Sequence, residues 1–136
     1  MAKAANGGAS VLVVEDEPLI RLFLADVLRD AGLEVTEACT ADEAADILAG
    51  QQYNAVLTDV TMPGRMDGVE LAAHVCRDHP GTAVIVASAN DVGGEVPDDV
   101  PFLRKPYNVR QLVRLVTMLV SQSHPPPGNG QRNARQ

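Results

Sequence analysis

Apolar residues occur along this chain in short continuous runs that alternate with stretches of helical spacing. The runs at residues 10–14, 54–58 and 82–89 are typical of strands that are buried on both faces of a sheet. Residues 33–38 alternate apolar with polar side chains and therefore predict a half-exposed edge strand. A fifth short run, at residues 101–106, predicts a last strand.

The stretches between these runs predict amphipathic helices, because their apolar residues recur at intervals of three and four. Two helix starts carry a cap pattern: Thr40 is followed by Glu43, and Asn108 is followed by Gln111. The helices are expected at residues 18–31, about 41–49, about 69–78 and about 109–120.

Strands and helices thus alternate, which predicts an α/β fold with a parallel sheet covered on both faces. With right-handed crossovers, the natural architecture is a flavodoxin-like, doubly wound, five-stranded sheet in the order 2-1-3-4-5. Residues 10–121 are expected to form this one domain. Residues 1–9 are expected to be a disordered lead-in, and residues 122–136 a disordered Pro/Gly-rich tail.

Composition narrows the possible partners and the compartment. The 136 residues carry a formal net charge of −7, which argues against nucleic acid as a direct partner. No apolar run reaches the length of a transmembrane helix, and the N-terminus lacks the apolar core of a secretion signal, so no membrane association is expected. Cys39 and Cys76 lie far apart without metal-ligand spacing. We expect two small buried thiols and no disulfide, in a cytoplasmic protein.

Four of the five predicted strands end in a polar or charged side chain. Glu15 and Asp16 follow the first strand, and Asp59 follows the third; Ser88 and Lys105 end the fourth and fifth. The carboxyl ends of parallel strands meet at one edge of a sheet, where ligands collect. These side chains are therefore expected to converge, although they lie far apart in sequence.

Three clustered carboxylates repel one another and raise one another's pKa values. A hard divalent cation such as Mg²⁺, which prefers oxygen ligands, removes this repulsion, and Lys105 supplies a second, fixed positive charge. Asp59 is then a carboxylate nucleophile between a metal and an ammonium. This arrangement suits phosphoryl transfer, which needs neutralisation of the phosphoryl oxygens, and an aspartate can itself form an acyl phosphate.

Four segments that carry these residues resemble the receiver domains of response regulators in bacterial two-component signalling. The segments are "VVEDEP", "LTDVTMPGRMDG", "VASA" and "FLRKPY", and the resemblance covers about residues 10–121. It implies that Asp59 is the phosphoacceptor and that Lys105 contacts the phosphoryl group. It also implies that Glu15 and Asp16 hold Mg²⁺ together with Asp59 and the backbone carbonyl of Thr61.

The resemblance implies further roles around this site. Ser88 is the switch hydroxyl, and Phe102 matches the position of the switch aromatic. The Lys105–Pro106 peptide bond is cis in this family. The side chains of Thr61 and Asn90 flank the approach of a hydrolytic water and set how long the phosphate survives.

Two segments depart from the family pattern. Between Ser88 and Phe102 the family has a full fourth helix, whereas this chain has "ANDVGGEVPDDVP". Glycine costs a helix interior about 1 kcal/mol and proline about 3 kcal/mol, so a shortened or irregular element is expected there. The loop "MPGRMDG" carries Arg65 as a one-residue insertion.

The expected function is that of a phosphorylation switch, not an enzyme. A sensor histidine kinase or a phosphotransfer protein donates the phosphoryl group, and contacts with an unknown downstream protein change. The tail is too short for a DNA-binding fold, so a stand-alone, single-domain regulator is expected, with a fragment of a longer protein as the other reading. A phosphate sink and a phosphorylation-independent interaction module are alternatives. A phosphohydrolase of the haloacid-dehalogenase type is disfavoured because position 61 is Thr, not Asp.

Overall fold

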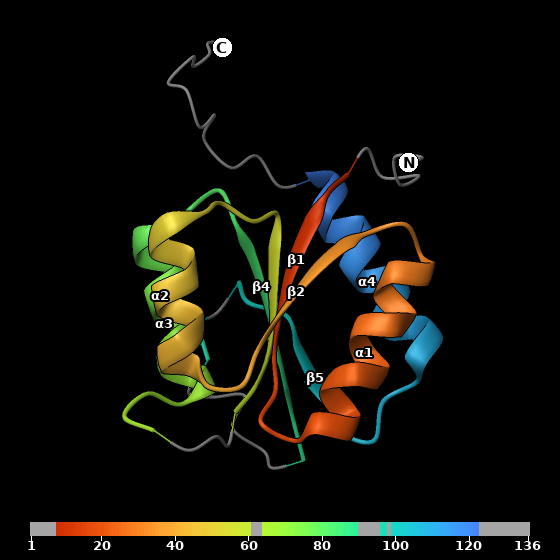
Figure 1. Cartoon of the computed structure of the whole chain (residues 1–136), viewed down its shortest axis with the longest axis horizontal. Helices are drawn as coiled ribbons and strands as arrows, with labels where there is room; N and C mark the ends of the chain where they lie inside the picture. The colour runs from red at the N-terminus through yellow and green to blue at the C-terminus, as the bar shows by residue number, and fades with distance from the viewer. Residues whose placement is uncertain (1–7, 61–63, 90–95, 98, 123–136) are drawn as a thin grey trace, which may run out of the picture.

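The structure is a computed structural model that describes residues 8–60, 64–89, 96–97 and 99–122. The described residues form five strands and four helices (Figure 1). The strands are β1 (Ser10–Val14), β2 (Glu34–Ala38), β3 (Ala55–Asp59), β4 (Ala83–Ser88) and β5 (Phe102–Arg104). The helices are α1 (Pro18–Asp30), α2 (Ala41–Gly50), α3 (Gly68–Asp78) and α4 (Val109–Gln122).

The strands form one parallel sheet in the order β2-β1-β3-β4-β5, which confirms the predicted flavodoxin-like topology. β1 and β3 are neighbours at its centre, and Val14 pairs with Thr58. The next residue on each strand is an acid, Glu15 on one and Asp59 on the other. The register therefore places these two carboxylates at the same level of the sheet edge.

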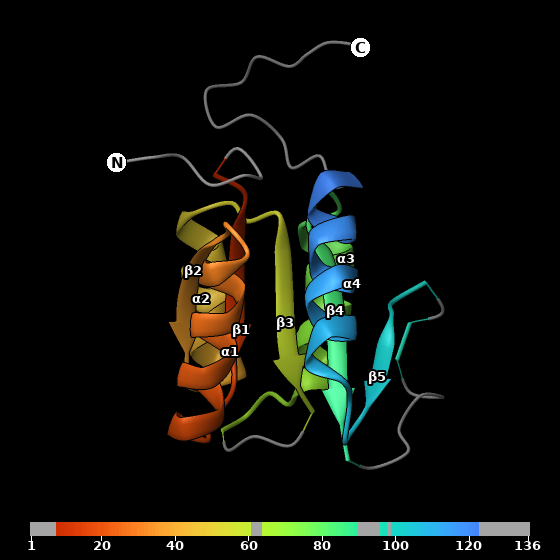
Figure 2. The ribbon, with the colours of Figure 1, turned by 90° about the vertical axis from the view of Figure 1, so that its right-hand side faces the viewer.

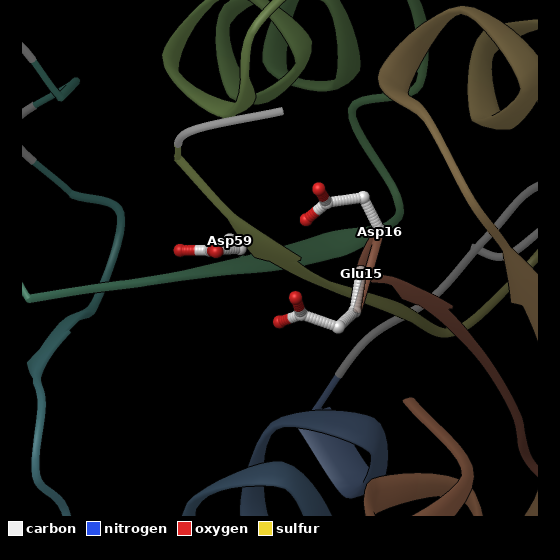
Figure 3. A group of neighbouring side chains, drawn as sticks. All are labelled: Glu15, Asp16 and Asp59. Carbon is white, nitrogen blue, oxygen red and sulfur yellow. The ribbon is translucent and has the colours of Figure 1, made fainter. Parts of the chain in front are cut away.

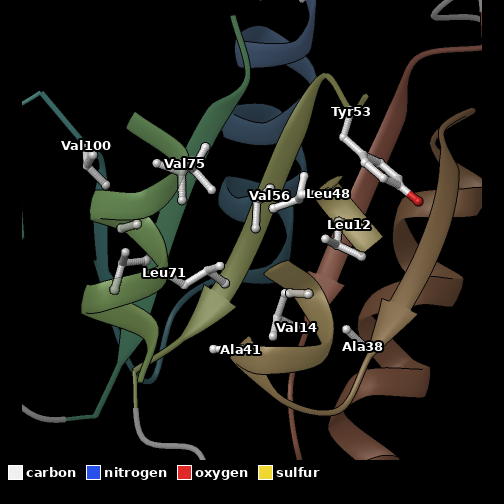
Figure 4. Packing of buried hydrophobic residues seen from close by; sticks show 14 of the residues in the cluster. Leu12, Val14, Ala38, Ala41, Leu48, Tyr53, Val56, Leu71, Val75 and Val100 are labelled. Atoms are coloured by element: carbon white, nitrogen blue, oxygen red, sulfur yellow. The ribbon is translucent and has the colours of Figure 1, made fainter. Parts of the chain in front are cut away.

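Helices cover the sheet on both faces, with α1 and α4 on one side and α2 and α3 on the other (Figures 1 and 2). Neighbouring side chains of a strand point to opposite faces, so β1 contributes Leu12 to one core and Val13 to the other. Figure 4 shows the core beneath α2 and α3, which includes Val56 of β3 and Leu71 of α3. Burial on both faces explains why these strands read as continuous apolar runs.

Side chains cap three of the helices. The hydroxyl of Thr40 accepts the N–H of Glu43 at 3.0 Å, and Asn108 caps α4 by accepting two backbone N–H groups through Oδ1. Both caps were predicted. A reciprocal capping box of Asp67 and Glu70 begins α3.

Two details differ from the sequence-based expectations. β5 ends at Arg104, so Lys105 lies just beyond the strand. The prediction of buried cysteines is wrong: Cys39 and Cys76 are free but exposed. Cys39 follows the edge strand β2, and on α3 the neighbouring Val75 takes the core position.

The connection between β4 and β5 is described only in part. Its described residues contain no helix, and the N–H of Val100 donates to the carbonyl of Pro97 at 3.0 Å. Val96 and Val100 are buried in the core beneath α2 and α3. The predictions for Thr61, Asn90, residues 1–7 and residues 123–136 fall outside the described residues. None of the described helices has the length and apolar character that a membrane span requires.

Candidate functional site

Two carboxylates lie at the centre of the sheet edge that is formed by the C-terminal ends of the strands. Asp59 is the last residue of β3, and its Oδ1 accepts the N–H of Val60 at 2.8 Å. Glu15 follows β1, and its N–H donates to the carbonyl of Ala38 at 3.0 Å, which extends the β1–β2 ladder by one residue. The side chain of Glu15 is almost fully buried, whereas that of Asp59 is partly accessible.

Asp16 completes a cluster of three carboxylates with Glu15 and Asp59. Each residue offers one oxygen, and these oxygens all lie within 4.8 Å of one another. Figure 3 shows the side chains of Glu15 and Asp16 extending from the end of β1 toward Asp59. Asp16 is exposed, so the cluster is open to solvent on that side.

Lys105 brings a positive charge to the same place. Its Nζ lies 3.5 Å from Oδ2 of Asp59 and 3.8 Å from Oε1 of Glu15. The N–H of Lys105 donates to the carbonyl of Ser88 at 2.8 Å, which attaches the residue to the end of β4. The Lys105–Pro106 peptide bond that follows is cis.

The charges at the cluster do not balance. Burial raises the pKa of Glu15, and the carboxylates of Asp59 and Asp16 raise it further, while the N–H of Glu17 and the Lys105 ammonium lower it. Three carboxylates face one ammonium, so full ionisation leaves two negative charges in excess. A divalent cation with oxygen ligands has the matching charge and donor preference. The residues present therefore fit Mg²⁺.

The other two expected switch residues lie on neighbouring strands. Ser88 is buried at the end of β4, the strand next to β3. Phe102 pairs with Val86 in the β4–β5 register and packs against the core beneath α2 and α3. The structure thus brings Glu15, Asp16, Asp59, Ser88 and Lys105 to one edge of the sheet, with Phe102 deeper in the fold.

Two features beside the site were not predicted from the sequence. Tyr107 lines a mainly apolar cavity of about 390 Å³, together with Ile20, Ala89, Lys105 and Pro106. Burial raises the pKa of Tyr107, and so do the Glu15 and Asp59 carboxylates. No local pattern signals that the chain turns back toward Asp59 after Lys105.

The second feature is the junction between β3 and α3. Gly68 has no room for a side chain, since a Cβ there would overlap the carbonyl oxygen of Asp59. The N–H of Gly68 donates to the carbonyl of Val60 at 2.9 Å. The pattern Asp67-x-x-Glu70 is a capping-box signal that could have identified this junction. The inserted Arg65 donates its N–H to Asp42 of α2 at 2.9 Å.

The family model of the response regulator receiver domain matches residues 11–117. The chain belongs to this family. Receiver domains generally act as phosphoacceptor switches in two-component signalling, and the order of the five strands agrees with that assignment.

Relatives of this receiver domain occur in proteins of different size. The chain is 34% identical over 124 residues to the sensor kinase CckA of Brucella abortus, and the match covers 86% of this chain but only 13% of CckA. It is 30% identical over 115 residues to the response regulator receiver protein CpdR of the same organism, with 81% of this chain and 95% of CpdR covered.

Solved receiver structures superpose on this one. The response regulator TrrA of Thermotoga maritima, crystallised in complex with Mg²⁺ and BeF, is 27% identical with a TM-score of 0.72, and the match covers 82% of this chain and 98% of TrrA. The receiver domain of NtrX from Brucella abortus is also 27% identical, with a TM-score of 0.75 and coverage of 83% and 99%.

Proposed function

We propose that Asp59 accepts a phosphoryl group from a histidine kinase or a phosphotransfer protein, with Mg²⁺ bound beside it. The observation that carries this proposal is the placement of the Asp59 carboxylate between the Lys105 ammonium, 3.5 Å away, and the carboxylates of Glu15 and Asp16. Family membership supports the same role.

Glu15, Asp16 and Asp59 would hold the ion, together with the Thr61 carbonyl that the family resemblance adds. When bound, Mg²⁺ neutralises charge on the phosphoryl oxygens and on the cluster itself. The related TrrA was crystallised with Mg²⁺ and BeF, which supports Mg²⁺ as the cofactor of this chain.

The chain's own residues position the reaction. A carboxylate oxygen of Asp59 forms a bond to phosphorus while the P–N bond of the donor phosphohistidine breaks, and the electron pair of that bond stays on the imidazole nitrogen. The N–H of Val60 orients the Asp59 carboxylate. The Lys105 ammonium offsets negative charge on the transferred phosphoryl oxygens.

The switch residues then respond to the added negative charge on Asp59. The Ser88 hydroxyl donates to a phosphoryl oxygen, Phe102 changes its packing, and Thr61 and Asn90 set the lifetime of the acyl phosphate. This biases a two-state surface that a downstream protein recognises.

Phosphorylation with a small-molecule donor tests the proposal without a cognate kinase. The full chain is incubated with acetyl phosphate and Mg²⁺, and its intact mass is measured. The wild-type protein should gain one phosphoryl group, and it should gain none after Mg²⁺ is chelated.

Asp59→Asn should stay unmodified. Asp46→Asn, which changes an exposed carboxylate on α2, should be modified like the wild type. Equal modification of Asp59→Asn would refute the proposal, and no modification of any variant, with Mg²⁺ shown to bind, would favour a phosphorylation-independent interaction module.

A further inference from the structure

Glu15 is held in place by groups from several parts of the fold. Its N–H donates to the carbonyl of Ala38 at 3.0 Å. Its carboxylate accepts the N–H of Glu17 at 3.2 Å and lies 3.8 Å from Nζ of Lys105. Its backbone carbonyl accepts Nη1 of Arg21 at 2.9 Å. Lys105 follows β5, whereas Arg21 belongs to α1, so the helix also contributes to the position of Glu15.

The guanidinium of Arg21 is itself anchored on a second strand. Its Nε donates to Oε1 of Glu37 at 3.2 Å, and Glu37 lies on β2, the neighbour of β1. The side chain of Arg21 is only 15% exposed. A guanidinium is a rigid, planar fork of donors, so its contact with the Glu37 carboxylate restricts where its other donors point. Arg21 therefore links the residue that follows β1 to a fixed point on β2.

The carbonyl that Arg21 binds belongs to the peptide bond between Glu15 and Asp16. Neighbouring side chains of an extended strand point to opposite faces, whereas both of these carboxylates extend toward Asp59 (Figure 3). The backbone accordingly bends at Asp16 and Glu17 before α1 begins. Among the described residues, Arg21 provides the one hydrogen-bond donor to this carbonyl. Because a peptide unit is planar, holding its carbonyl oxygen also orients the start of Asp16.

We propose that Arg21 is a positioning residue for the Mg²⁺ site. Its guanidinium orients the peptide bond between Glu15 and Asp16 and so holds both carboxylates where they face Asp59. This inference rests on the proposed function, because it concerns the cation that the three carboxylates would hold. Groups that orient metal ligands without touching the metal typically contribute about 10–100-fold to metal affinity. Arg21 acts through the backbone of a ligand residue, so we expect the lower end of that range.

Arg29 provides a matched control on the same helix. Its Nη2 lies 3.4 Å from Oε2 of Glu37 and donates to the carbonyl of Val35 at 3.0 Å. Arg29 thus shares with Arg21 the helix, the carboxylate partner and a contact with a backbone carbonyl. The carbonyl that Arg29 binds lies in β2, however, whereas the carbonyl that Arg21 binds belongs to Glu15. A difference between the two alanine variants therefore reports on the contact with Glu15.

Titration calorimetry of Mg²⁺ into the full chain tests the inference directly. Arg21→Ala should raise the dissociation constant of Mg²⁺ about tenfold, and Arg29→Ala should leave it nearly unchanged. Arg21→Lys should raise it by less than Arg21→Ala, because an ammonium keeps the charge but not the fork of donors. The lysine variant also provides the test if the alanine variant does not fold. A wild-type dissociation constant in either folded Arg21 variant would overturn the inference.

Amide hydrogen exchange tests the same role without any cation. The N–H of Glu17 donates to Oε2 of Glu15, so its protection reports whether the bend after β1 is held. In metal-free protein, this N–H should exchange faster in Arg21→Ala than in the wild type or in Arg29→Ala. The N–H of Val56, in the buried strand β3, should keep its protection. Unchanged exchange at Glu17, or an equal loss of protection at Val56, would overturn a specific role of Arg21.

The Mg²⁺ dependence of phosphorylation separates this inference from the proposed function. With acetyl phosphate as the donor, Arg21→Ala should react more slowly than the wild type at low Mg²⁺ concentration. Its rate should approach that of the wild type when Mg²⁺ is saturating, because the variant loses affinity and not reactivity. Phosphorylation of Asp59 with the same Mg²⁺ dependence in both proteins would refute the role of Arg21 and leave the proposed function standing. A wild-type chain that binds no Mg²⁺ would refute both.

Discussion

Lys105 depends on backbone contacts for its position beside Asp59. Its N–H is held by the carbonyl of Ser88 at 2.8 Å, and its side chain is only one-quarter exposed, with Nζ 3.5 Å from Oδ2 of Asp59. A positive charge placed before the reaction begins needs little reorganisation as charge moves onto the phosphoryl oxygens. Lys105 is therefore expected to matter more for phosphoryl transfer than for Mg²⁺ binding.

Replacing Lys105 by Ala should separate these two functions. The rate of phosphorylation by acetyl phosphate should fall by about 100-fold, as when one preorganised donor is removed from an oxyanion site. Mg²⁺ affinity should be unchanged or higher, because a competing cation is lost. Intact-mass kinetics and a Mg²⁺ titration measure the two quantities. Arg104→Ala, at the exposed neighbouring position, should keep a near wild-type rate; an equal loss there would contradict a specific role for Lys105.

The reactivity of Cys76 tests the local electrostatics of α3. Partial burial of its sulfur raises the pKa of this otherwise exposed residue, and the Asp99 carboxylate raises it further. Less thiolate is present at a given pH, so at pH 8 iodoacetamide should alkylate Cys76 more slowly in the folded chain than in the urea-unfolded chain. A Cys39→Ser background leaves one thiol to follow by mass spectrometry. Asp99→Asn should accelerate the reaction, because one cause of the raised pKa is removed, and no acceleration would remove Asp99 as a cause.

At the scale of elements, the start of α3 lies directly against the end of β3. Gly68 lies so close to β3 that a Cβ would overlap the Asp59 carbonyl oxygen and lie 2.8 Å from the Cα of Val60. Helix and strand can approach only without a side chain at this position. The same close approach holds the start of α3 against the backbone of Asp59.

Gly68→Ala should therefore lower the free energy of unfolding by about 2 kcal/mol or more, and phosphorylation of Asp59 should slow with it. Gly50→Ala is the matched control, because nothing lies within 4 Å of a Cβ at the end of α2. That change should be neutral or stabilising by up to about 1 kcal/mol. Urea denaturation measures both, and equal stability of the two variants would contradict the close approach.

Much of the element order could be predicted from the sequence because burial leaves a local trace. β1 and β3 are buried on both faces and read as continuous apolar runs, and the caps at Thr40 and Asn108 depend on residues within one turn. The sequence pattern does not show which apolar residues of a helix face the core and which face outward. The apolar spacing of α1 predicted a helix, but it could not tell that Leu19 and Phe23 face outward.

The candidate site could be predicted as far as its residues lie at the ends of strands that the sequence already indicates. Glu15, Asp59 and Lys105 directly follow strands or end them, so strand order alone brings them together. Tyr107 reaches the site by a turn of the chain after β5, and the burial of Cys76 was misjudged because its neighbour on the helix faces the core. These outcomes depend on tertiary packing, which a single sequence does not display.

For the whole molecule, the fold holds like charges close together. Glu15 is buried against Asp59 and Asp16, with its pKa raised mainly by burial, so the folded chain without a cation carries unfavourable electrostatic energy. A cation that binds the folded state and not the unfolded chain stabilises the fold by mass action. The proposed phosphoacceptor chemistry and the thermal stability are therefore expected to be linked through one cluster.

Mg²⁺ should accordingly stabilise the protein against heat. At a free concentration ten times the dissociation constant it should add about 1.4 kcal/mol, which corresponds to a Tm increase of about 3–6 °C. Asp16→Asn should lose most of this increase, because it removes one of the three clustered carboxylates. Glu17→Gln, which removes the neighbouring acid outside the cluster, should retain it. Scanning calorimetry with and without Mg²⁺ measures the Tm of each variant. An equal Mg²⁺-dependent increase in Tm for Asp16→Asn and Glu17→Gln would exclude the proposed ligand set.

The most direct measurement locates the phosphoryl group itself. The full chain is phosphorylated with Mg²⁺ present, the acyl phosphate is reduced with borohydride, and peptides are sequenced by mass spectrometry. The account predicts that Asp59, and no other carboxylate, is converted to homoserine. Conversion of Asp16 or another acid in place of Asp59, from a wild-type chain that binds Mg²⁺, would contradict it.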